Sequence, residues 1–315
     1  MMRSLGLRKG EVVEVRGLDE IVSTLDGQGK MDGLAFMPEM GRLCGQRFRV
    51  HARADRTCVE HMGKRGLHDT VWLEDVRCDG SAHDGCEIGC LMFWKEAWLK
   101  RAEATAAAAA PGPAEPISSW PFPIRDEATG KYTCQSTSLE GATKHLGFWG
   151  NGLTHLRDLY YGNVSLARLA KTLFIYASLK LRGHYKSIRD IRGDLTKTPT
   201  ESLELEPGEV VEVKTPDEIR STLDVNGKNR GMLFTLDLLD FCGGRYEVEK
   251  RIDRCIDEGT SEMRSIKSSV ILKGVTCPGT YRRGCMRCTK IIWREAWVKR
   301  TGDAKAVGTR SANIV

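Results

Sequence analysis

Apolar and polar residues alternate in short runs in several parts of the chain, and these runs are separated by glycine and other turn-forming residues. Alternation with a period of two predicts strands that bury one face. The alternating apolar positions are Val13 and Val15, Phe48, Val50 and Ala52, Val71 and Leu73, and Val270 and Leu272.

This pattern occurs twice. The segment GEVVEV is found at 10–15 and again at 208–213, and LDEIVSTLDGQGK at 18–30 matches PDEIRSTLDVNGK at 216–228, at an offset of 198 residues that becomes 199 towards the end of each copy. Self-similarity of this kind indicates two copies of one structural unit. The copies span roughly 7–101 and 206–300.

Each copy is predicted to contain a strand, a short helix and several further short strands. In the second copy Thr215 suits the N-cap of the helix, Pro216 its first turn and Glu218 a capping box, while Gly17 takes the cap position in the first copy. Short strands around one small helix predict a small, strongly bent β-barrel of the Src-homology type. The expected fold class is mainly β (α+β), with two such barrels.

Both copies end in a segment with two tryptophans, FWKEAW at 93–98 and IWREAW at 292–297. We expect the tryptophans to pack inside the barrels, because aromatic side chains bury a large apolar area. The charged couples inside these segments, Lys-Glu and Arg-Glu, are predicted to lie on a solvated face.

The middle of the chain has a different composition, with a low-complexity linker predicted at Ala102–Pro116. We therefore divide the chain into four parts. These are repeat one at 1–103, the linker and helical middle segment at 104–205, repeat two at 206–301 and a tail at 302–315.

A helix is predicted within 165–182, with Ser165 as its N-cap and basic residues on its second side. This helix either packs on one of the barrels or rests, as a basic amphipathic helix, on a membrane surface or a partner. The apolar positions at helical spacing are Leu166, Leu169, Leu173, Ala177 and Leu181.

Composition narrows the classes of protein. The chain has 315 residues with a net charge of +6, a charge too small by itself to indicate nucleic-acid binding. Its N-terminus has no apolar core of a secretory signal and no run of eighteen apolar residues follows, so we expect a cytoplasmic protein with reduced thiols. For its eleven cysteines, metal ligation or thiol chemistry is then favoured over disulfides.

Four cysteines of each copy are aligned and carry the main chemical prediction. Two cysteines of a loop with two or three residues between them, together with two distant thiols, are typical of a tetrahedral zinc site. A metal ion would also help so small a barrel to fold, so we expect about one ion per copy. The alternative is that reduced cysteines serve as small apolar side chains. The predicted ligands are Cys44, Cys78, Cys86 and Cys90 in copy one and Cys242, Cys277, Cys285 and Cys288 in copy two.

Copy one also has His83 and Cys58, whereas copy two has Arg282 in place of His83 and has Cys255 one residue out of register with Cys58. Cys134 lies outside both copies. We take Cys58, His83 and Cys134 as candidate catalytic residues: His83 as a metal ligand or as a residue that orients one, Cys58 as a thiolate beside the metal, and Cys134 as a nucleophile if its pKa is lowered. Zinc is the expected metal, and iron is an alternative in repeat one.

The segments CDGSAHDGCEIGCLMFWKEAWLKR, FMPEMGRLCGQRFRV, CQSTSLEGATKHL and GNVSL resemble a family of bacterial proteins of unassigned function. Its members have two such repeats around a helical middle and occur beside genes for natural-product or polysaccharide biosynthesis. The resemblance covers most of the chain. It implies that the following residues lie in family motifs: Cys44, Cys58, Cys78, His83, Cys86, Cys90 and Cys134.

Two functions therefore stay open. The first is a thiolate metal-binding protein of a bacterial biosynthetic pathway, which acts as a metal-dependent tailoring enzyme with its centre in repeat one. The second is a non-catalytic, zinc-stabilised module that binds a pathway enzyme, a carrier protein or RNA. The sequence has no Gly-rich phosphate loop, nucleophile elbow or His-Glu zincin motif, so kinase, dehydrogenase and hydrolase functions have no support.

Overall fold

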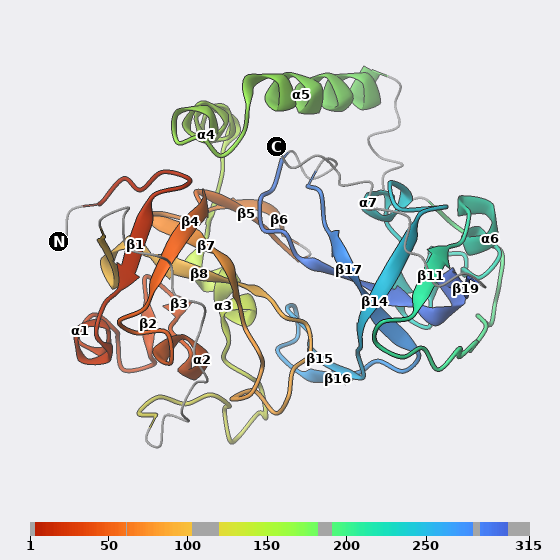
Figure 1. Ribbon diagram of the computed structural model, residues 1–315, viewed down its shortest axis with the longest axis horizontal. Helices are drawn as coiled ribbons and strands as arrows, with labels where there is room; N and C mark the ends of the chain where they lie inside the picture. The colour runs from red at the N-terminus through yellow and green to blue at the C-terminus, as the bar shows by residue number, and fades with distance from the viewer. Residues whose placement is uncertain (1–3, 61, 103–119, 182–190, 280–283, 302–315) are drawn as a thin grey trace. The chain divides into compact units, whose positions relative to one another are not determined.

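The structure of the protein is a computed structural model that describes residues 4–60, 62–102, 120–181, 191–279 and 284–301 (Figure 1). The chain forms two compact units. Unit 1 contains Met1–Leu166, Cys255–Arg264 and Cys285–Arg287, and unit 2 contains Ala167–Arg254, Ser265–Gly284 and Cys288–Val315. The predicted linker from residue 103 onwards, the predicted tail at 302–315 and residue 182 of the predicted helix lie outside the described residues.

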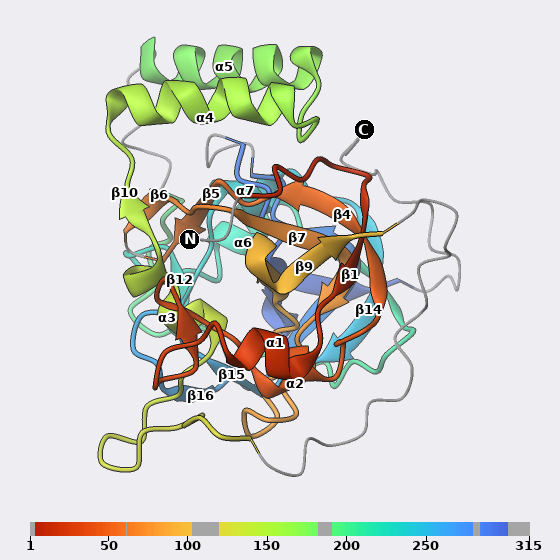
Figure 2. The same ribbon diagram turned by 90° about the vertical axis from the view of Figure 1, so that its left-hand side faces the viewer.

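Unit 1 is built on a curled sheet of five antiparallel strands in the order β8-β7-β4-β1-β9 (Figure 2). Along the chain, the 3-10 helix η1 (Glu96–Trp98) lies between β8 and β9, and β9 pairs with β1. The strands are β1 (Val12–Val15), β4 (Arg47–Arg53), β7 (Thr70–Arg77), β8 (Leu91–Lys95) and β9 (Leu99–Arg101).

Unit 2 repeats this order of strands as β18-β17-β14-β11-β19, with η3 (Glu295–Trp297) before the last strand (Figure 1). Its strands are β11 (Val210–Val213), β14 (Arg245–Arg251), β17 (Ser269–Thr276), β18 (Lys290–Arg294) and β19 (Val298–Arg300). Both sheets curl into half-barrels, and the predicted mainly β fold with two small barrels is confirmed.

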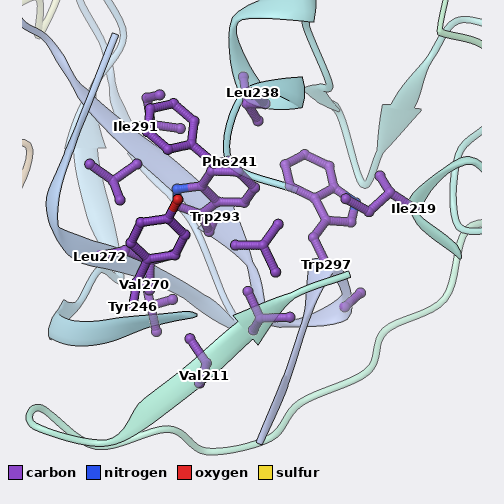
Figure 3. Packing of buried hydrophobic residues seen from close by; sticks show 14 of the residues in the cluster. Val211, Ile219, Leu238, Phe241, Tyr246, Val270, Leu272, Ile291, Trp293 and Trp297 are labelled. Carbon is purple, nitrogen blue, oxygen red and sulfur yellow. The ribbon is translucent and has the colours of Figure 1, made fainter. Parts of the chain in front are cut away.

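The alternating apolar residues face the two cores. Val71 and Leu73 of unit 1 and Val270 and Leu272 of unit 2 are fully buried. In unit 2 they belong to the same core cluster as Trp293, which Figure 3 shows. Burying a large apolar side chain is worth about 1.5–3 kcal/mol, so these positions account for much of each barrel's stability.

The second tryptophan of each pair has the same surroundings in both units. Trp98 lies edge-on to Phe36 at a ring distance of 5.1 Å, and Trp297 lies edge-on to Phe234 at 5.2 Å. Each indole N–H donates to a threonine hydroxyl at 3.2 Å. All four tryptophans of the two segments are completely buried, so the prediction that they pack inside the barrels is confirmed.

The charged couples between the tryptophans are also buried, and the prediction of a solvated face is wrong. Glu96 accepts the backbone N–H groups of Leu7 at 2.9 Å and Gly6 at 3.0 Å, and it pairs with buried Arg53. Glu295 accepts the N–H of Leu203 at 2.6 Å in the same way. Each carboxylate anchors the chain that leads into the first strand, and these hydrogen bonds offset its burial.

The short helices begin as the sequence predicts. In α6 (Pro216–Arg220) the Glu218 N–H donates to the Thr215 hydroxyl at 3.3 Å, and the Glu218 carboxylate accepts from the Thr215 N–H at 2.7 Å. In α1 (Leu18–Val22), Gly17 offers no side chain, and its N–H donates to Glu20 at 3.0 Å. Each unit has one further helix of four residues, α2 (Pro38–Gly41) and α7 (Leu236–Leu239).

Several short strands lie outside the two main sheets. β10, β6 and β5 form a three-stranded sheet in unit 1, and the other short strands form two-stranded pairs. Their bounds are β2 (Lys30–Met31) with β3 (Leu34–Ala35), β5 (Arg56–Val59), β6 (Gly63–Gly66) and β10 (Lys144–His145), β12 (Lys228–Asn229) with β13 (Met232–Leu233), and β15 (Arg254–Ile256) with β16 (Met263–Ser265).

The middle segment supplies α3 (Gln135–Ala142), α4 (Phe148–Tyr160) and α5 (Leu166–Leu181). In α5 Leu169 is buried, whereas Leu173, Phe174 and Leu181 are 46%, 74% and 87% exposed. Contact of 165–182 with a membrane surface or a partner stays a prediction. Among the described residues, no helix is both long and apolar enough to cross a membrane.

Candidate metal centre

The connection from Cys78 to Cys90, between β7 and β8, forms a closed loop in unit 1. The Cys78 N–H donates to the Cys90 carbonyl at 2.8 Å, and inside the loop the His83 N–H donates to the Gly80 carbonyl at 2.9 Å. Gly80 has a φ of +70°, and a Cβ there would lie 1.9 Å from the carbonyl oxygen of Cys86. Only glycine therefore fits this turn, which carries His83 into the interior.

His83 is buried and has a polar partner on each ring nitrogen. Its Nδ1 lies 2.7 Å from Oε1 of Glu39, and its Nε2 lies 3.1 Å from the carbonyl oxygen of Thr133. An imidazole whose Nε2–H donates to a backbone carbonyl is held in one orientation, and its Nδ1 is then directed at Glu39. Histidines that bind metal ions are commonly fixed in this way.

Glu39 lies on α2, directly after Pro38 at the helix start, and is 4% exposed. Its Oε1 also accepts the Ala82 N–H at 3.2 Å and lies 3.8 Å from the sulfur of Cys78. Its second oxygen, Oε2, is buried and has no hydrogen-bond partner among the residues that the structure describes. A buried carboxylate oxygen without a partner is costly, so this oxygen marks a place for a cation or a donor.

Glu39, Cys78 and His83 each offer one ligand atom, and these atoms lie within 4.8 Å of one another. Carboxylate oxygen, thiolate sulfur and imidazole nitrogen are all ligands that zinc accepts. The three residues come from α2, from the end of β7 and from the loop turn, so the folded barrel is required to assemble them. The donor set fits a transition-metal ion.

The surroundings of these groups set their charges. Burial disfavours the imidazolium, but the hydrogen bond and charge of Glu39 outweigh it and raise the pKa of His83. Burial also disfavours the carboxylate, yet the hydrogen bond from His83 lowers the pKa of Glu39. Burial, with the charge of Glu39, raises the pKa of the Cys78 thiol. Without an ion, the site thus holds a buried imidazolium–carboxylate pair beside a neutral thiol.

A small cavity of ≈ 30 Å³ adjoins two of the three residues, Cys78 and His83, with room for about one or two water molecules. Cys78 and His83 line it together with three more thiols, those of Cys86, Cys90 and Cys134. The rest of the lining is mostly apolar and includes Met37, Ile88, Phe93 and Ile256. A ligand bound at this position would be shielded from bulk water.

Cys134 is held at the cavity by its neighbour Gln135, the first residue of α3. The Gln135 side chain donates to the Phe93 carbonyl at 2.7 Å and accepts the Phe93 N–H at 2.8 Å, so it mimics a strand beside β8. Burial raises the pKa of Cys134 to about 12. The lowered pKa that a nucleophilic role for Cys134 requires is not provided by these surroundings, and that role stays a prediction.

The other predicted ligands have different positions. Cys44 does not line this cavity, and burial raises its pKa to about 11. Cys242 packs against the core of unit 2 and lies 3.8 Å from the Leu238 carbonyl. Cys285 belongs to unit 1, where it is buried. Among the described residues, neither Cys277 nor Cys288 joins a three-ligand group, and the metal site of copy two stays a prediction.

The two cysteine loops match one residue differently from the sequence alignment. The base of the loop in unit 2 is closed by the Cys277 N–H donating to the Thr289 carbonyl at 2.8 Å, so Thr289 rather than Cys288 corresponds to Cys90. Cys288 takes the place of Gly89, and both residues have positive φ, 47° and 68°. The predicted match of Cys288 with Cys90 is therefore corrected, because these two cysteines occupy different positions of their loops.

Sequence reasoning missed Glu39. One signal for it exists, since Glu39 stands between Met37 and Met40 in an apolar segment, and copy two keeps an acid, Asp237, at the same position. Both acids are buried. An acid retained inside an apolar run of both copies indicates a buried partner.

Comparison with known proteins gave no match to a family model, to a curated protein or to a solved structure.

Proposed function

We propose that the protein is a metal-binding protein of a bacterial biosynthetic pathway, with one transition-metal ion, zinc in the first place, held by Glu39, Cys78 and His83 of unit 1. The observation that carries this proposal is the set of three ligand atoms within 4.8 Å. One of them is on a carboxylate whose other oxygen is buried and finds no partner in the described part of the chain. Iron is the alternative metal for the same residues, and the second ion expected for copy two stays a prediction.

The ligand set favours a catalytic over a purely structural ion. Structural zinc sites are usually closed by four thiolates and imidazoles, whereas catalytic sites have three protein ligands, often including a carboxylate, and an open position. Here the three ligands are of mixed type, and two of them, Cys78 and His83, line a small cavity that is large enough for a water molecule. A metal ion at such a position activates water or polarises a carbonyl group of a substrate.

The protein residues have separate tasks in this proposal. Glu39 supplies negative charge, Cys78 supplies a thiolate, and His83 supplies a neutral nitrogen once its proton has left. Thr133 fixes the imidazole through its carbonyl oxygen. Because the ion replaces the protons of His83 and Cys78, its binding is expected to release protons and to weaken at low pH.

Cobalt substitution of the full chain tests the proposal. We expect Co²⁺ to give a sulfur-to-metal charge-transfer band that Cys78→Ser removes, and visible bands that His83→Ala and Glu39→Gln change. Cys44→Ser is the matched control and should leave the spectrum unchanged. Added azide should shift the visible bands if one coordination position is open. An unchanged spectrum with azide would indicate a structural ion, and a spectrum unaffected by all three ligand variants would overturn the site.

A further inference from the structure

A second cavity lies in unit 1, and none of the three proposed metal ligands lines it. Its volume is ≈ 580 Å³, within the range of about 300–1,000 Å³ that is usual for sites of small organic molecules. Residues of α4, β6 and β10 line it (Figure 2), and three of the lining residues are buried, Asp55, Leu67 and Thr154. The cavity therefore reaches into the unit. Cys58, on β5, lines neither this cavity nor the one beside the metal ligands, so a catalytic role for it stays a prediction.

One face of α4 supplies an apolar wall to this cavity. Leu153, Leu156 and Tyr160 all line it, and their spacing of three and four residues places them on the same face of the helix. They are 61%, 64% and 65% exposed. Large apolar side chains that gather in a cavity and stay exposed mark a binding surface, because a ligand that covers them removes their apolar area from water.

The polar part of the lining is basic. Arg157 of α4 and Lys144 and His145 of β10 line the cavity. The acid among the lining residues is Asp55, and its carboxylate is already paired with Arg53 at 3.2 Å and with Arg157 at 3.1 Å. Positive charge therefore exceeds negative charge around the cavity, which favours an anionic ligand.

Arg157 is fixed along one edge of its guanidinium. Its Nε and Nη2 contact the two oxygens of Asp55 at 3.1 Å and 3.3 Å, and its central carbon lies 5.7 Å from the centre of the Tyr161 ring. Its Nη1 makes no hydrogen bond to any residue that the structure describes, and the side chain is 44% exposed. An arginine held in this way is already oriented to donate hydrogen bonds to a carboxylate or a phosphate.

Lys144 brings a second cation to the cavity from a different element. It pairs with Gly66 across β10 and β6, and the Arg65 guanidinium donates to the hydroxyl and the carbonyl of the preceding Thr143 at 2.7 Å and 2.8 Å. The backbone of β10 is thus fixed, whereas Lys144 is exposed and has no ion pair within the described ranges. Its ammonium group is available to an anion.

We propose that this cavity binds an amphiphilic organic anion, a molecule with one carboxylate or phosphate group on an aromatic or apolar body. Arg157 and Lys144 receive the anionic group, and Leu153, Leu156 and Tyr160 pack against the body. The proposal does not depend on the metal ion.

Calorimetric titration of the full chain tests this proposal with three probes that share one ring system: 1-naphthyl phosphate, 1-naphthoate and the neutral 1-naphthol. We expect both anions to bind with a Kd about tenfold or more below that of 1-naphthol. Added salt should reduce this difference, because it screens the charges. The anion that binds more tightly identifies the ionic group of the ligand.

Substitutions separate the two parts of the cavity. Arg157→Gln and Lys144→Gln should each weaken binding of the anions about threefold to tenfold and leave 1-naphthol unchanged. Leu156→Ser should weaken all three probes. The matched control is Lys131→Gln, at an exposed lysine of unit 1 that does not line the cavity, and it should change none of the three Kd values. These side chains are at least 44% exposed or classed as exposed, so the fold should persist in every variant.

Three results would contradict the proposal. The first is equal affinity for the three probes, and the second is that none of them binds at millimolar concentration. The third is binding of the anions that Arg157→Gln and Lys144→Gln leave unchanged or that Lys131→Gln weakens as much. The cobalt spectrum of the same samples reports separately on the proposed metal site.

Discussion

The β7–β8 connection of unit 1 and the β17–β18 connection of unit 2 are closed by the same hydrogen bond, 2.8 Å long in each, and turn over equivalent glycines. A buried acid lies at the same position of the preceding short helix in both units, Glu39 on α2 and Asp237 on α7. The sequences differ at the turn, where His83 is replaced by Arg282. An arginine keeps its positive charge at any accessible pH, whereas a histidine can give up its proton and bind a metal ion.

This difference distinguishes the backbone contacts that close the loop from the side chain that is proposed to bind a metal ion in it. The closing hydrogen bond and the glycine of the turn are common to both units, and the residue that the sequence has at the position of His83 is not. In copy two the sequence has an arginine at this position, which stays positively charged. In copy one it has a histidine, which can bind either a proton or a metal ion. We therefore expect the backbone contacts to respond alike to substitution in the two units and the metal chemistry to respond in unit 1 alone.

The largest effect is expected for the buried glutamates that anchor the first strands. Arg53 is fully buried and pairs with two buried carboxylates, Glu96 and Asp55. Glu96→Ala removes one of them, together with the acceptor of two backbone N–H groups, and should cost about 3 kcal/mol of local stability. Glu295→Ala should cost less, since its partner Arg251 is 30% exposed and 3.7 Å away. Hydrogen exchange with mass spectrometry, read at β1 and β11, measures both. Equal effects, or a larger one in unit 2, would contradict the comparison.

A smaller effect is expected at the turn that carries His83. Gly80→Ala places a Cβ against the Cys86 carbonyl in addition to the strain of a positive φ, and we expect a loss of about 2 kcal/mol together with weaker metal binding. Gly63→Ala is the control, because Gly63 has a similar φ of +74° and nothing within 4 Å of its Cβ. It should cost about 1 kcal/mol, the strain alone. Similar losses of stability and metal for the two variants would show that the turn does not position the site.

The smallest effect concerns pH in the presence of a chelator. The raised pKa of His83 stabilises the folded protein below about pH 6.5, and this contribution is lost as pH rises through the folded-state pKa. The lowered pKa of Glu39 stabilises it above about pH 4.3, and this is lost as pH falls through the folded-state pKa. Urea unfolding of the wild type against a Glu39→Gln/His83→Gln variant should show the largest difference between these two values. A difference that does not change with pH would exclude the ion pair.

Much of the fold could be predicted because it depends on local patterns. Alternation placed Val71 and Leu73 in a buried strand, and the capping residues Thr215 and Glu218 marked the start of α6. These signals arise within a few residues, where side-chain period and hydrogen-bond capacity act directly.

The candidate site could be predicted only in part, since contacts between distant segments decide it. Spacing brought attention to Cys78 and His83 but not to Glu39, which meets them from another element. The burial of Glu96 was missed for the same reason, because its partners at Gly6 and Leu7 are remote in sequence.

The central claim is that a metal ion binds in unit 1 through Glu39, Cys78 and His83, of which copy two lacks the histidine. Native mass spectrometry of the full chain, purified under reducing conditions, counts the ions in the wild type, in Cys78→Ser and in the matched variant Cys277→Ser. The account predicts that Cys78→Ser binds one ion fewer than the wild type and that Cys277→Ser keeps the ion of unit 1. A wild type without an ion, or an ion count that Cys78→Ser leaves unchanged, would contradict it.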